Sequence, residues 1–397
     1  MKVLWHSNAP WSPTGYGQQT GLFAPLLKEH HDVTISSFYG LDGAPLEWSG
    51  IQVLPGIPQD FGNMSLWQHA EEVFGARRDG LLFTLMDVWV LDPSMIKGLN
   101  AACWVPVDHE PCPPAVIDFF ASSDAIPICI ARFGQEQLAR FNPLYVPHGV
   151  DTEVYKPEDR SKVREALDLD EDAFVIGMAA ANKGRPSRKA FSEAFQGVAP
   201  IIRENENAYL YLHTIMEPSH AAGENIPKLL DALEIPRDRV RVTNQYRNIY
   251  RPFPPDAMSR LFYNALDVLI NPSWGEGFGI TPLEAQACGV PVIVGDNTAQ
   301  REVCGAGWQV EGRRVWTGQN SWQHSPLPED ITSALEECRT LPAAQRASLK
   351  TAARQHALKY DAKRVCKEFL LPSLRQVELR LEARRPVTIA PRKAVAA

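Results

Sequence analysis

The sequence predicts an α/β protein of two domains, each built on a doubly wound parallel sheet, with a C-terminal helix that crosses back to the first domain. In residues 1–150, short apolar runs alternate with amphipathic helical patterns, which is typical of βαβ units. The same alternation begins again within residues 151–365. After Pro328 the strand patterns end. We expect residues 366–385 to form a helix that braces the first domain and the basic, alanine-rich residues 386–397 to be disordered.

Six strands and at least two helices are expected in the first domain. The helical pattern is clear at Gln18–Glu29, where Leu22, Leu26 and Leu27 fall on one face, and it recurs at Leu66–Phe74. The expected strands are Val3–His6, Val33–Phe38, Leu81–Leu85, Ala102–Val107, Ile126–Ile130 and Leu144–Val146.

A linker is expected between the two domains. Residues Pro147–Pro157 are bracketed by prolines and rich in turn-forming residues, as segments between domains often are. Beyond the linker, each apolar run is followed by a helical pattern, and a long helical run covers Ala357–Leu381. The strands expected in the second domain are Phe174–Ala179, Tyr209–His213, Val240–Thr243, Val268–Asn271 and Val290–Val294.

Composition limits the classes of function. The chain has 397 residues, 45% of them hydrophobic and 22% charged, which is enough for two ordinary domains, and its net charge of -7 gives no general attraction to nucleic acid or anionic lipid. The start of the chain lacks a secretory apolar region, and the longest apolar stretch, Leu81–Leu91, contains Asp87 and is too short to span a bilayer. The seven cysteines include no C-x-x-C pair. We therefore expect reduced thiols and a cytoplasmic protein without a transmembrane segment.

The segment Asp267–Gly289 carries the strongest functional signal. Its pattern predicts a buried strand, a glycine-rich loop and a helix that opens near Thr281. The glycines at positions 275, 277 and 279 allow backbone N–H groups to approach a ligand closely. The helix start behind them attracts a phosphate or a sugar hydroxyl. This segment is therefore a candidate ligand site.

Two carboxylates in this segment can address one ligand. Glu276 lies in the glycine loop, and Glu284 lies one turn inside the helix, where a carboxylate suits vicinal hydroxyls such as those of a ribose. Each has an alternative role. Thr281 and Glu284 also fit a capping box, in which Glu284 binds the backbone N–H of Thr281. Glu276 also fits a solvated turn residue.

The pattern resembles the retaining family-four glycosyltransferases of the GT-B fold. It has two glutamates separated by seven residues, after a strand that ends in Pro-Ser and before Ala-Cys-Gly-Val-Pro-Val-Ile, and the resemblance extends over residues 1–385. It implies two Rossmann-like domains that face a central cleft, with the nucleotide sugar on the C-terminal domain and the acceptor on the N-terminal domain. It also implies that Glu284 holds the ribose and that Glu276 contacts the transferred sugar. Further donor contacts that the resemblance implies are Gly277, Phe278, Gly279, Ile280 and Thr281.

A basic loop follows the first strand of the second domain and precedes a helix expected at Ala190–Gly197. Its basic residues are Lys183, Arg185, Arg188 and Lys189, and such a turn suits a diphosphate. The resemblance implies an arginine and a lysine here that neutralise the departing diphosphate. The usual Gly-Arg at the strand end is absent, so Arg185 and Arg188 are both candidates. We favour Arg188 with Lys189, which lie closest to the helix start; Lys183 and Arg185 also fit solvated loop charges.

The loop after the first strand carries a weaker glycine signal. Gly15, Tyr16 and Gly17 precede the expected helix, where backbone N–H groups can meet a phosphate. A dinucleotide fingerprint requires a third glycine where Thr20 stands and an acid at the end of the second strand, and both are absent. The resemblance implies that this loop lies over the donor diphosphate, although a tight turn requires the same glycines.

Three further residues follow strands at the edge where open α/β sheets bind ligands. The resemblance implies that His109 contacts the transferred sugar, and that Asp108 orients His109 or meets the acceptor hydroxyl. A histidine that only makes structural hydrogen bonds is the alternative. Tyr246 follows a strand of the second domain where the family receives the base, so it is expected either to stack on the base or to belong to the core.

The expected function is retaining transfer of a sugar from a nucleoside diphosphate sugar, such as a UDP- or GDP-sugar, to a hydroxyl of a glycan, protein or small molecule. Neither a cofactor nor a metal ion is expected, because the sequence has no metal-ligand set. The alternatives are a nucleotide-sugar epimerase or phosphorylase of the same fold and a non-catalytic nucleotide-sugar-binding partner subunit. A phosphorylase requires a pyridoxal-binding lysine that nothing here singles out, and intact Glu276, Glu284 and Lys189 weigh against a non-catalytic subunit.

Overall fold

The N-terminal half of the chain forms a sheet of eight strands. The structure, a computed structural model, describes residues 1–75, 79–218, 223–250 and 253–384. The strands are β1 (Lys2–Asn8), β2 (Asp32–Tyr39), β3 (Leu46–Trp48), β4 (Ile51–Pro55), β5 (Gly80–Leu85), β6 (Ala101–Val105), β7 (Ile126–Cys129) and β8 (Leu144–Tyr145). Their order is β3-β4-β2-β1-β5-β6-β7-β8, and every pair except β3 with β4 is parallel. All six strands predicted for this half are confirmed.

Helices cover both faces of this sheet, as expected for a doubly wound domain. The α-helices are α1 (Gly15–Lys28), α2 (Asn63–Phe74), α3 (Pro93–Ile96), α4 (Pro114–Ser123) and α5 (Arg132–Gln137). Phe23 and Leu27 of α1 pack on the sheet face that carries Trp5, whereas α2 and α4 pack on the face that carries Leu4. Successive residues of β1 therefore point into two separate buried layers.

The hairpin of β3 and β4 at the edge of the sheet was not predicted. Its loop consists of Ser49 and Gly50, whose φ angles of 50° and 70° are those of a two-residue type I′ turn. β3 has only three residues and is largely exposed, so it lacks the apolar run that marks a buried strand.

The C-terminal half forms a second sheet with six parallel strands. The strands are β9 (Phe174–Ala179), β10 (Ala208–His213), β11 (Val240–Val242), β12 (Val268–Asn271), β13 (Val292–Gly295) and β14 (Gly307–Val310). Their order is β11-β10-β9-β12-β13-β14. The five predicted strands are confirmed, whereas β14, a partly exposed edge strand, was missed.

Nine α-helices accompany this sheet within the described residues. They are α6 (Ser161–Ala166), α7 (Phe191–Glu204), α8 (Ile226–Ala232), α9 (Gln245–Tyr250), α10 (Pro255–Leu261), α11 (Ile280–Ala287), α12 (Gln300–Val303), α13 (Pro328–Thr340) and α14 (Ala343–Ala357). α7 is longer than predicted, because Ile201 and Ile202 continue its buried face beyond Pro200.

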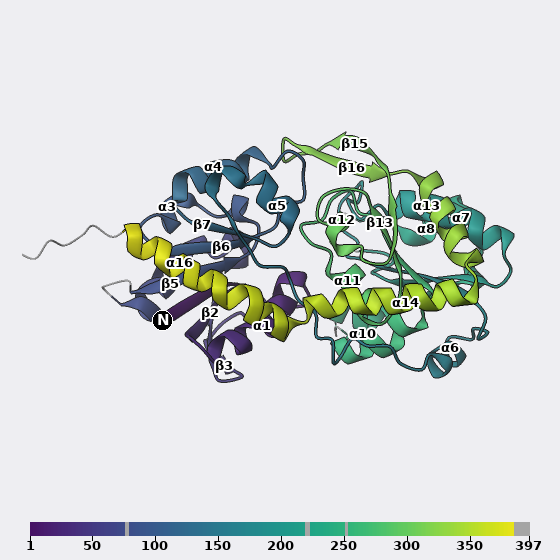
Figure 1. Cartoon of the computed structure of the whole chain (residues 1–397), viewed down its shortest axis with the longest axis horizontal. Helices are drawn as coiled ribbons and strands as arrows, with labels where there is room; N and C mark the ends of the chain where they lie inside the picture. Colours follow the sequence, from purple (N-terminus) through teal and green to yellow (C-terminus); the bar gives the residue numbers. More distant parts are fainter. Residues whose placement is uncertain (76–78, 219–222, 251–252, 385–397) are drawn as a thin grey trace, which may run out of the picture.

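A second unpredicted hairpin reaches from the C-terminal half to the N-terminal half. It consists of β15 (Gly312–Trp316) and β16 (Trp322–Pro326), which form a separate two-stranded antiparallel sheet (Figure 1). The backbone N–H of Glu110 donates to the carbonyl oxygen of Trp322 (3.0 Å), and the hydroxyl of Ser321 donates to that of Pro111. The hairpin is thus fixed to the loop that follows β6.

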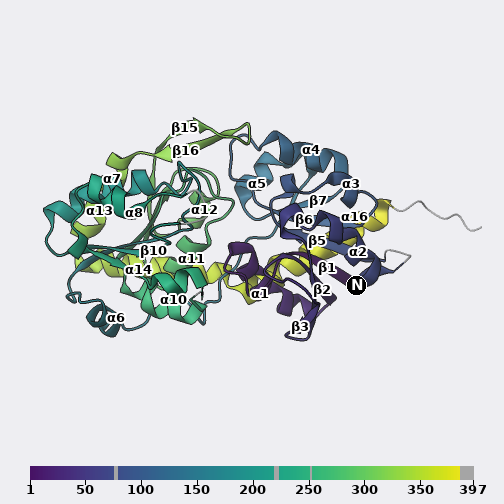
Figure 2. The same ribbon diagram turned by 180° about the vertical axis from the view of Figure 1, so that it is seen from behind.

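The end of the chain returns to the N-terminal half, as predicted. The expected helical run is interrupted at Asp361, whose side chain caps α15 (Ala362–Val365), and it continues through a π-helical turn at Cys366–Leu370 into α16 (Leu371–Arg384). α16 lies along the first sheet in both views (Figures 1 and 2). Arg380 at 2.7 Å and Arg384 at 2.7 Å donate to carbonyl oxygens of that half. The predicted disordered tail, residues 386–397, lies outside the described residues.

The linker and the returning chain cross side by side. Val150 forms a parallel bridge with Asp361. The Gln19 side chain of α1 accepts the backbone N–H of Gly149 (2.9 Å) and donates to its carbonyl oxygen (2.9 Å). The two connections between the halves are thus bonded to each other and to α1.

Candidate active site

The glycine-rich segment forms the loop between β12 and α11, and the helix begins at Ile280, next to Thr281, as expected. Its N-cap is Gly279, which has a φ of 122° and no side chain to offer the helix. The hydroxyl of Thr281 instead accepts a hydrogen bond from the Asn271 side chain (2.7 Å). The capping-box alternative for Thr281 and Glu284 is therefore wrong.

Glu284 is buried and is held by side chains from both halves of the chain. Tyr263 donates to its Oε2 atom (2.6 Å), and the Gln18 amide of α1 donates to its Oε1 atom. Burial raises the pKa of Glu284, although the bonds from Tyr263 and Gln18 lower it. The carboxylate thus joins α11 to the first helix of the N-terminal half.

Two glycines of the loop allow the halves to meet closely. A Cβ atom at Gly275 would overlap the carbonyl oxygen of Asp108, and one at Gly277 would overlap the Pro106 side chain. Both partners follow β6 of the first sheet. These positions therefore require glycine for contact between the halves, a requirement separate from the predicted approach of a ligand.

The centre of the site is a cluster of Glu276 with Arg188 and Lys189. Lys189 donates to Oε1 of Glu276, and Nη1 of Arg188 lies 3.3 Å from Oε2 and 2.9 Å from the carbonyl oxygen of Gly275. The side chains of Glu276 and Lys189 are 11% and 19% exposed, and that of Arg188 is 46% exposed. α7 begins at Phe191, directly beyond the two cations. The fold thus joins two motifs that lie far apart in the sequence.

The cluster contains two basic side chains and one carboxylate, and they shift one another's pKa values. Burial raises the pKa of Glu276, but Lys189 and Arg188 outweigh burial and bring the pKa to about 2. Burial and the charge of Arg188 lower the pKa of Lys189, against the attraction of Glu276. Within these three residues, two positive charges therefore face one negative charge.

Asp108 and His109 follow β6 and face the cluster from the first sheet. His109 Nδ1 lies 2.6 Å from Asp108 Oδ1, and Nε2 lies 2.9 Å from the hydroxyl of Thr317 in the loop between β15 and β16. Burial opposes ionisation of Asp108, but the bond with His109 and the charge of Arg188 hold its pKa below the usual value. The histidine is thus held at both ring nitrogens, one of them by the hairpin.

Asp87 and Tyr16 complete this side of the site. Asp87 follows β5, the neighbour of β6, and its Oδ2 atom accepts a hydrogen bond from Tyr16 (2.9 Å). Burial and the charge of Asp108 raise the pKa of Asp87 to about 6, although Tyr16 and Arg188 lower it. Asp87 was not predicted as a site residue because it interrupts an apolar stretch. Its position directly after a buried strand, next to the strand that precedes Asp108, is the signal that identifies it.

Gly15, Tyr16 and Gly17 form the first turn of α1, so the helix begins a turn earlier than predicted. The cause is Thr14, whose hydroxyl accepts the backbone N–H of Gly17 (3.0 Å) and caps the helix. A Cβ atom at Gly17 would crowd the carbonyl oxygen of Ser12. The tight-turn alternative therefore accounts for Gly17.

Arg185 and Tyr246 lie on other parts of the C-terminal half. Arg185 is exposed and donates to the carbonyl oxygen of Gly223. Tyr246 lies in α9, is 64% exposed and has its ring 5.2 Å from that of Tyr250. Core packing, one alternative for Tyr246, is therefore wrong.

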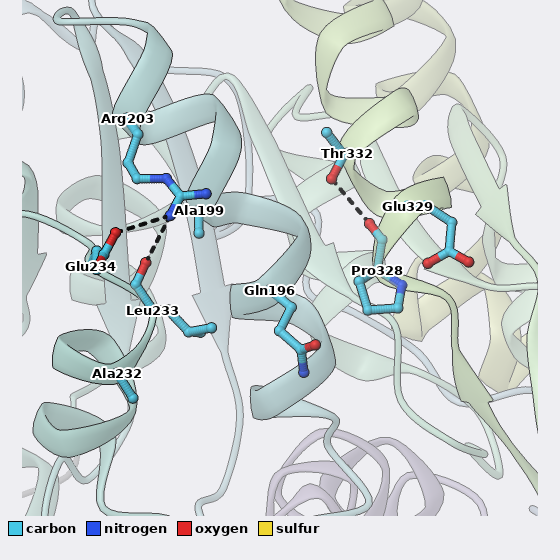
Figure 3. A pocket seen from close by; sticks show the side chains of 9 residues that line it. All are labelled: Gln196, Ala199, Arg203, Ala232, Leu233, Glu234, Pro328, Glu329 and Thr332. Atoms are coloured by element: carbon cyan, nitrogen blue, oxygen red, sulfur yellow. Dashed lines mark hydrogen bonds and ion pairs between the residues drawn. The ribbon is translucent and has the colours of Figure 1, made fainter.

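A surface hollow of about 450 Å³ lies apart from the cluster. It is lined by α7, α13 and the end of α8, and it contains the ion pair of Arg203 with Glu234 (3.7 Å; Figure 3). None of the predicted site residues lines it.

Within the described residues, no group of three His, Cys, Asp or Glu side chains is arranged to hold a metal ion. No helix in that part of the chain has the length and apolar character needed to cross a membrane. The seven cysteines are unpaired, as expected, and all except Cys304 are buried.

Two parallel-sheet domains, joined by a linker and by a returning C-terminal helix, define a GT-B fold and confirm the predicted fold class. Residues 176–321 match the family described as Glycosyl transferases group 1. The D-inositol 3-phosphate glycosyltransferase of Geodermatophilus obscurus is 30% identical over 223 residues, which are 54% of this chain and 43% of that protein. The match thus spans less than half of this relative.

Solved structures show the same fold along nearly the whole chain. Sucrose-phosphate synthase from Thermosynechococcus elongatus has a TM-score of 0.70 at 15% identity, covering 96% of this chain and 99% of that one. HepE from Anabaena, in complex with UDP and glucose, has a TM-score of 0.66 at 16% identity, covering 94% and 99%. Together with the family match, they confirm the resemblance to the family-four glycosyltransferases.

Proposed function

We propose that this chain transfers a sugar from a nucleoside diphosphate sugar to an acceptor hydroxyl, with retention of anomeric configuration and without a metal ion. The observation that carries the proposal is the cluster of Glu276, Arg188 and Lys189, which faces Asp108 and His109 of the other sheet. Cations beside a carboxylate suit a diphosphate joined to a sugar, and the groups opposite suit hydroxyls. The family match of the C-terminal half supports this assignment.

The donor diphosphate would bind at Arg188 and Lys189. The N-terminus of α7 begins beside them and adds partial positive charge, so two sources of positive potential act on one diphosphate. The UDP in the HepE complex supports a uridine nucleotide as the first candidate. In this proposal Glu284 takes the ribose and Tyr246 the base, while the loop over Gly15, Tyr16 and Gly17 and the segment 277–281 lie against the diphosphate and the sugar.

Transfer would proceed on one face of the sugar. The bond between the anomeric carbon and the departing phosphate oxygen breaks while the acceptor oxygen bonds to that carbon from the same side. The acceptor proton passes to the departing phosphate oxygen, so atoms and charge balance. Arg188 and Lys189 stabilise the negative charge that develops on the diphosphate, and Glu276 and His109 position the sugar. Preorganised charge of this kind needs no second carboxylate as a base.

Lys189→Ala tests the proposal. We expect it to reduce transfer, and hydrolysis of the donor by water, by about a hundredfold or more, because the ammonium contacts charge that grows in the transition state. UDP-, GDP-, ADP- and dTDP-sugars are first screened by thermal shift, since a ligand of the folded state raises the transition temperature. Release of the nucleoside diphosphate from the best donor is then followed.

The matched control is Lys228→Ala, an exposed lysine of α8. It should leave both rates unchanged. Circular dichroism and the melting temperature check that both variants are folded. Wild-type rates in folded Lys189→Ala would contradict the proposed role of the cluster, and the absence of nucleotide release from every donor with the wild type would contradict the proposed function.

A further inference from the structure

The loops at the carboxyl edge of the first sheet carry acidic side chains. Because the strands are parallel, the loops after β1, β2, β4, β5, β6 and β7 emerge at one edge. These loops are fully described, and apart from His109 and the buried Cys112 their titratable side chains are all carboxylates. They are Asp42, Asp60, Asp87, Asp92, Asp108 and Glu110.

Arg132, the basic residue directly beyond the loop after β7, is already engaged. Arg132 is the first residue of α5, and its guanidinium carbon lies 3.7 Å from the centre of the Tyr145 ring. It also donates to the Gln135 side chain (2.6 Å). This arginine is therefore poorly placed to receive an anionic group of an acceptor.

The cations of the opposite domain are also engaged. Arg188 and Lys189 both bond to Glu276, and the proposed function assigns their remaining positive charge to the donor diphosphate. Once a donor is bound, that charge is neutralised as well. A second phosphate on an acceptor bound at Asp87 and Asp108 would then meet these two carboxylates.

The charge of Arg188 acts on two of these acids, Asp87 and Asp108, which follow the neighbouring strands β5 and β6. Tyr16 fixes the Asp87 carboxylate at 2.9 Å, and Trp89, which is 44% exposed, lies against the same carboxylate. Carboxylates accept hydroxyl hydrogen bonds, and an exposed indole offers an apolar face to a sugar ring. The arrangement therefore suits a neutral compound with several hydroxyls.

We infer that the acceptor is an uncharged sugar or polyol, rather than a phosphorylated one, and that Asp87 together with Asp108 receives its hydroxyl groups. This inference rests on the proposed function. It separates this chain from its relative that is named for D-inositol 3-phosphate. A phosphate carries about two negative charges at neutral pH, and like charges a few ångströms apart in a partly buried site repel strongly.

The test compares acceptors that differ only by a phosphate. Glucose is paired with glucose 6-phosphate, glycerol with glycerol 3-phosphate, and myo-inositol with inositol 3-phosphate, each at high concentration with the donor found by thermal shift. Glycosylated product is detected by mass spectrometry. We expect the neutral member of the used pair to have a kcat/KM higher by about tenfold or more, from one unit of uncompensated charge repulsion.

Asp87→Asn tests the named residue, because it keeps the shape and removes the charge. We expect a KM for the neutral acceptor raised about tenfold, and a larger change in this KM than in the rate of acceptor-free donor hydrolysis, since a hydroxyl bonds more strongly to a charged oxygen than to a neutral one. Asp118→Asn, on the exposed face of α4, is the matched control and should change neither quantity.

Three results would overturn the inference. The first is a phosphorylated acceptor used as well as, or better than, its neutral partner. The second is a wild-type acceptor KM in folded Asp87→Asn. The third is donor hydrolysis without transfer to any member of the panel, since a site for hydroxylated acceptors should let them compete with water. If no donor is hydrolysed at all, the proposed function fails, and the inference fails with it.

Discussion

Glu276→Gln removes the one negative charge that holds two cations together. The pKa of Glu276 falls from its usual 4.5 to about 2, so the folded chain favours the ionised form of Glu276. At about 1.4 kcal/mol per pKa unit, this difference corresponds to about 3–4 kcal/mol. The side chain is 11% exposed, so solvent screens little of this interaction. We expect the variant to lose about 3–4 kcal/mol of unfolding free energy at pH 7.

The pH dependence follows from the sign of the shift. A carboxylate whose pKa is depressed in the folded chain stabilises it above the unfolded pKa, and this contribution is lost as the pH falls through the folded pKa. The difference between the wild type and Glu276→Gln should thus be constant from pH 7 to pH 5. This difference in stability should decrease as the pH falls from 4.5 to about 2, the usual and the folded pKa of Glu276.

Binding should respond in the opposite direction. With Glu276 neutral, Arg188 and Lys189 lack their partner, and a nucleoside diphosphate supplies the missing negative charge. UDP should therefore bind the variant at least as tightly as the wild type, while sugar transfer is lost. Tighter UDP binding without sugar transfer would show that the positive charge of the site binds the nucleotide but is not sufficient for catalysis.

Urea unfolding at pH 7 and pH 4, with and without UDP, measures the stability, and isothermal titration calorimetry measures UDP binding. Glu206→Gln, an exposed residue beyond α7, is the matched control. Equal stability of Glu276→Gln and wild type at pH 7 would refute the coupling derived from the pKa. Weaker UDP binding by the variant would refute the assignment of the surplus positive charge to the diphosphate.

Two further substitutions test the contact between the halves and a buried ion pair of the C-terminal half. Gly275→Ala should displace the loop after β6, increase the radius of gyration measured by small-angle scattering and reduce sugar transfer. Gly318→Ala is the control, because Gly318 has open space around it, and it should have none of these effects. Equal scattering from the two variants would contradict the close contact at Gly275. Arg164 is 1% exposed and donates to Asp267 (2.8 Å) and to three carbonyl oxygens. Arg164→Met should therefore lower the free energy of unfolding in urea by about 3–5 kcal/mol, and exposed Arg375→Met is the control. A loss no greater than that of the control would contradict a stabilising role of Arg164.

Strands were predictable from the sequence where their apolar runs are unbroken. β9 and β12 are buried along their whole length and match the prediction closely. β15 and β16 contain Arg313, Arg314 and His324 and depend on each other and on the N-terminal half for their pairing. Such a hairpin has no local apolar pattern to reveal it, because its stability comes from contacts far away in the sequence.

The candidate site also contains residues that a local sequence pattern indicates and residues that only distant contacts bring into place. Glu276, Arg188 and Lys189 were predictable because they stand in glycine- or proline-containing loops between a strand and a helix. Thr317 lies 208 residues from His109 and is an ordinary polar residue of a loop. Its bond to the His109 ring exists only because the hairpin crosses between the halves, and no spacing in the sequence encodes that crossing.

Glu284 connects donor binding to the relative position of the two halves. Its oxygens are occupied by Tyr263 from its own half and Gln18 from the other. In the proposed function, a ribose hydroxyl would compete with Gln18 for this carboxylate, and the bond from Gln18 is one of the contacts that hold α1 against α11. The contacts of Gly275 and Gly277 with the loop after β6 close the same boundary. If the proposed function holds, we expect the halves to separate when a nucleotide sugar enters and the ribose to replace Gln18 as a partner of the carboxylate.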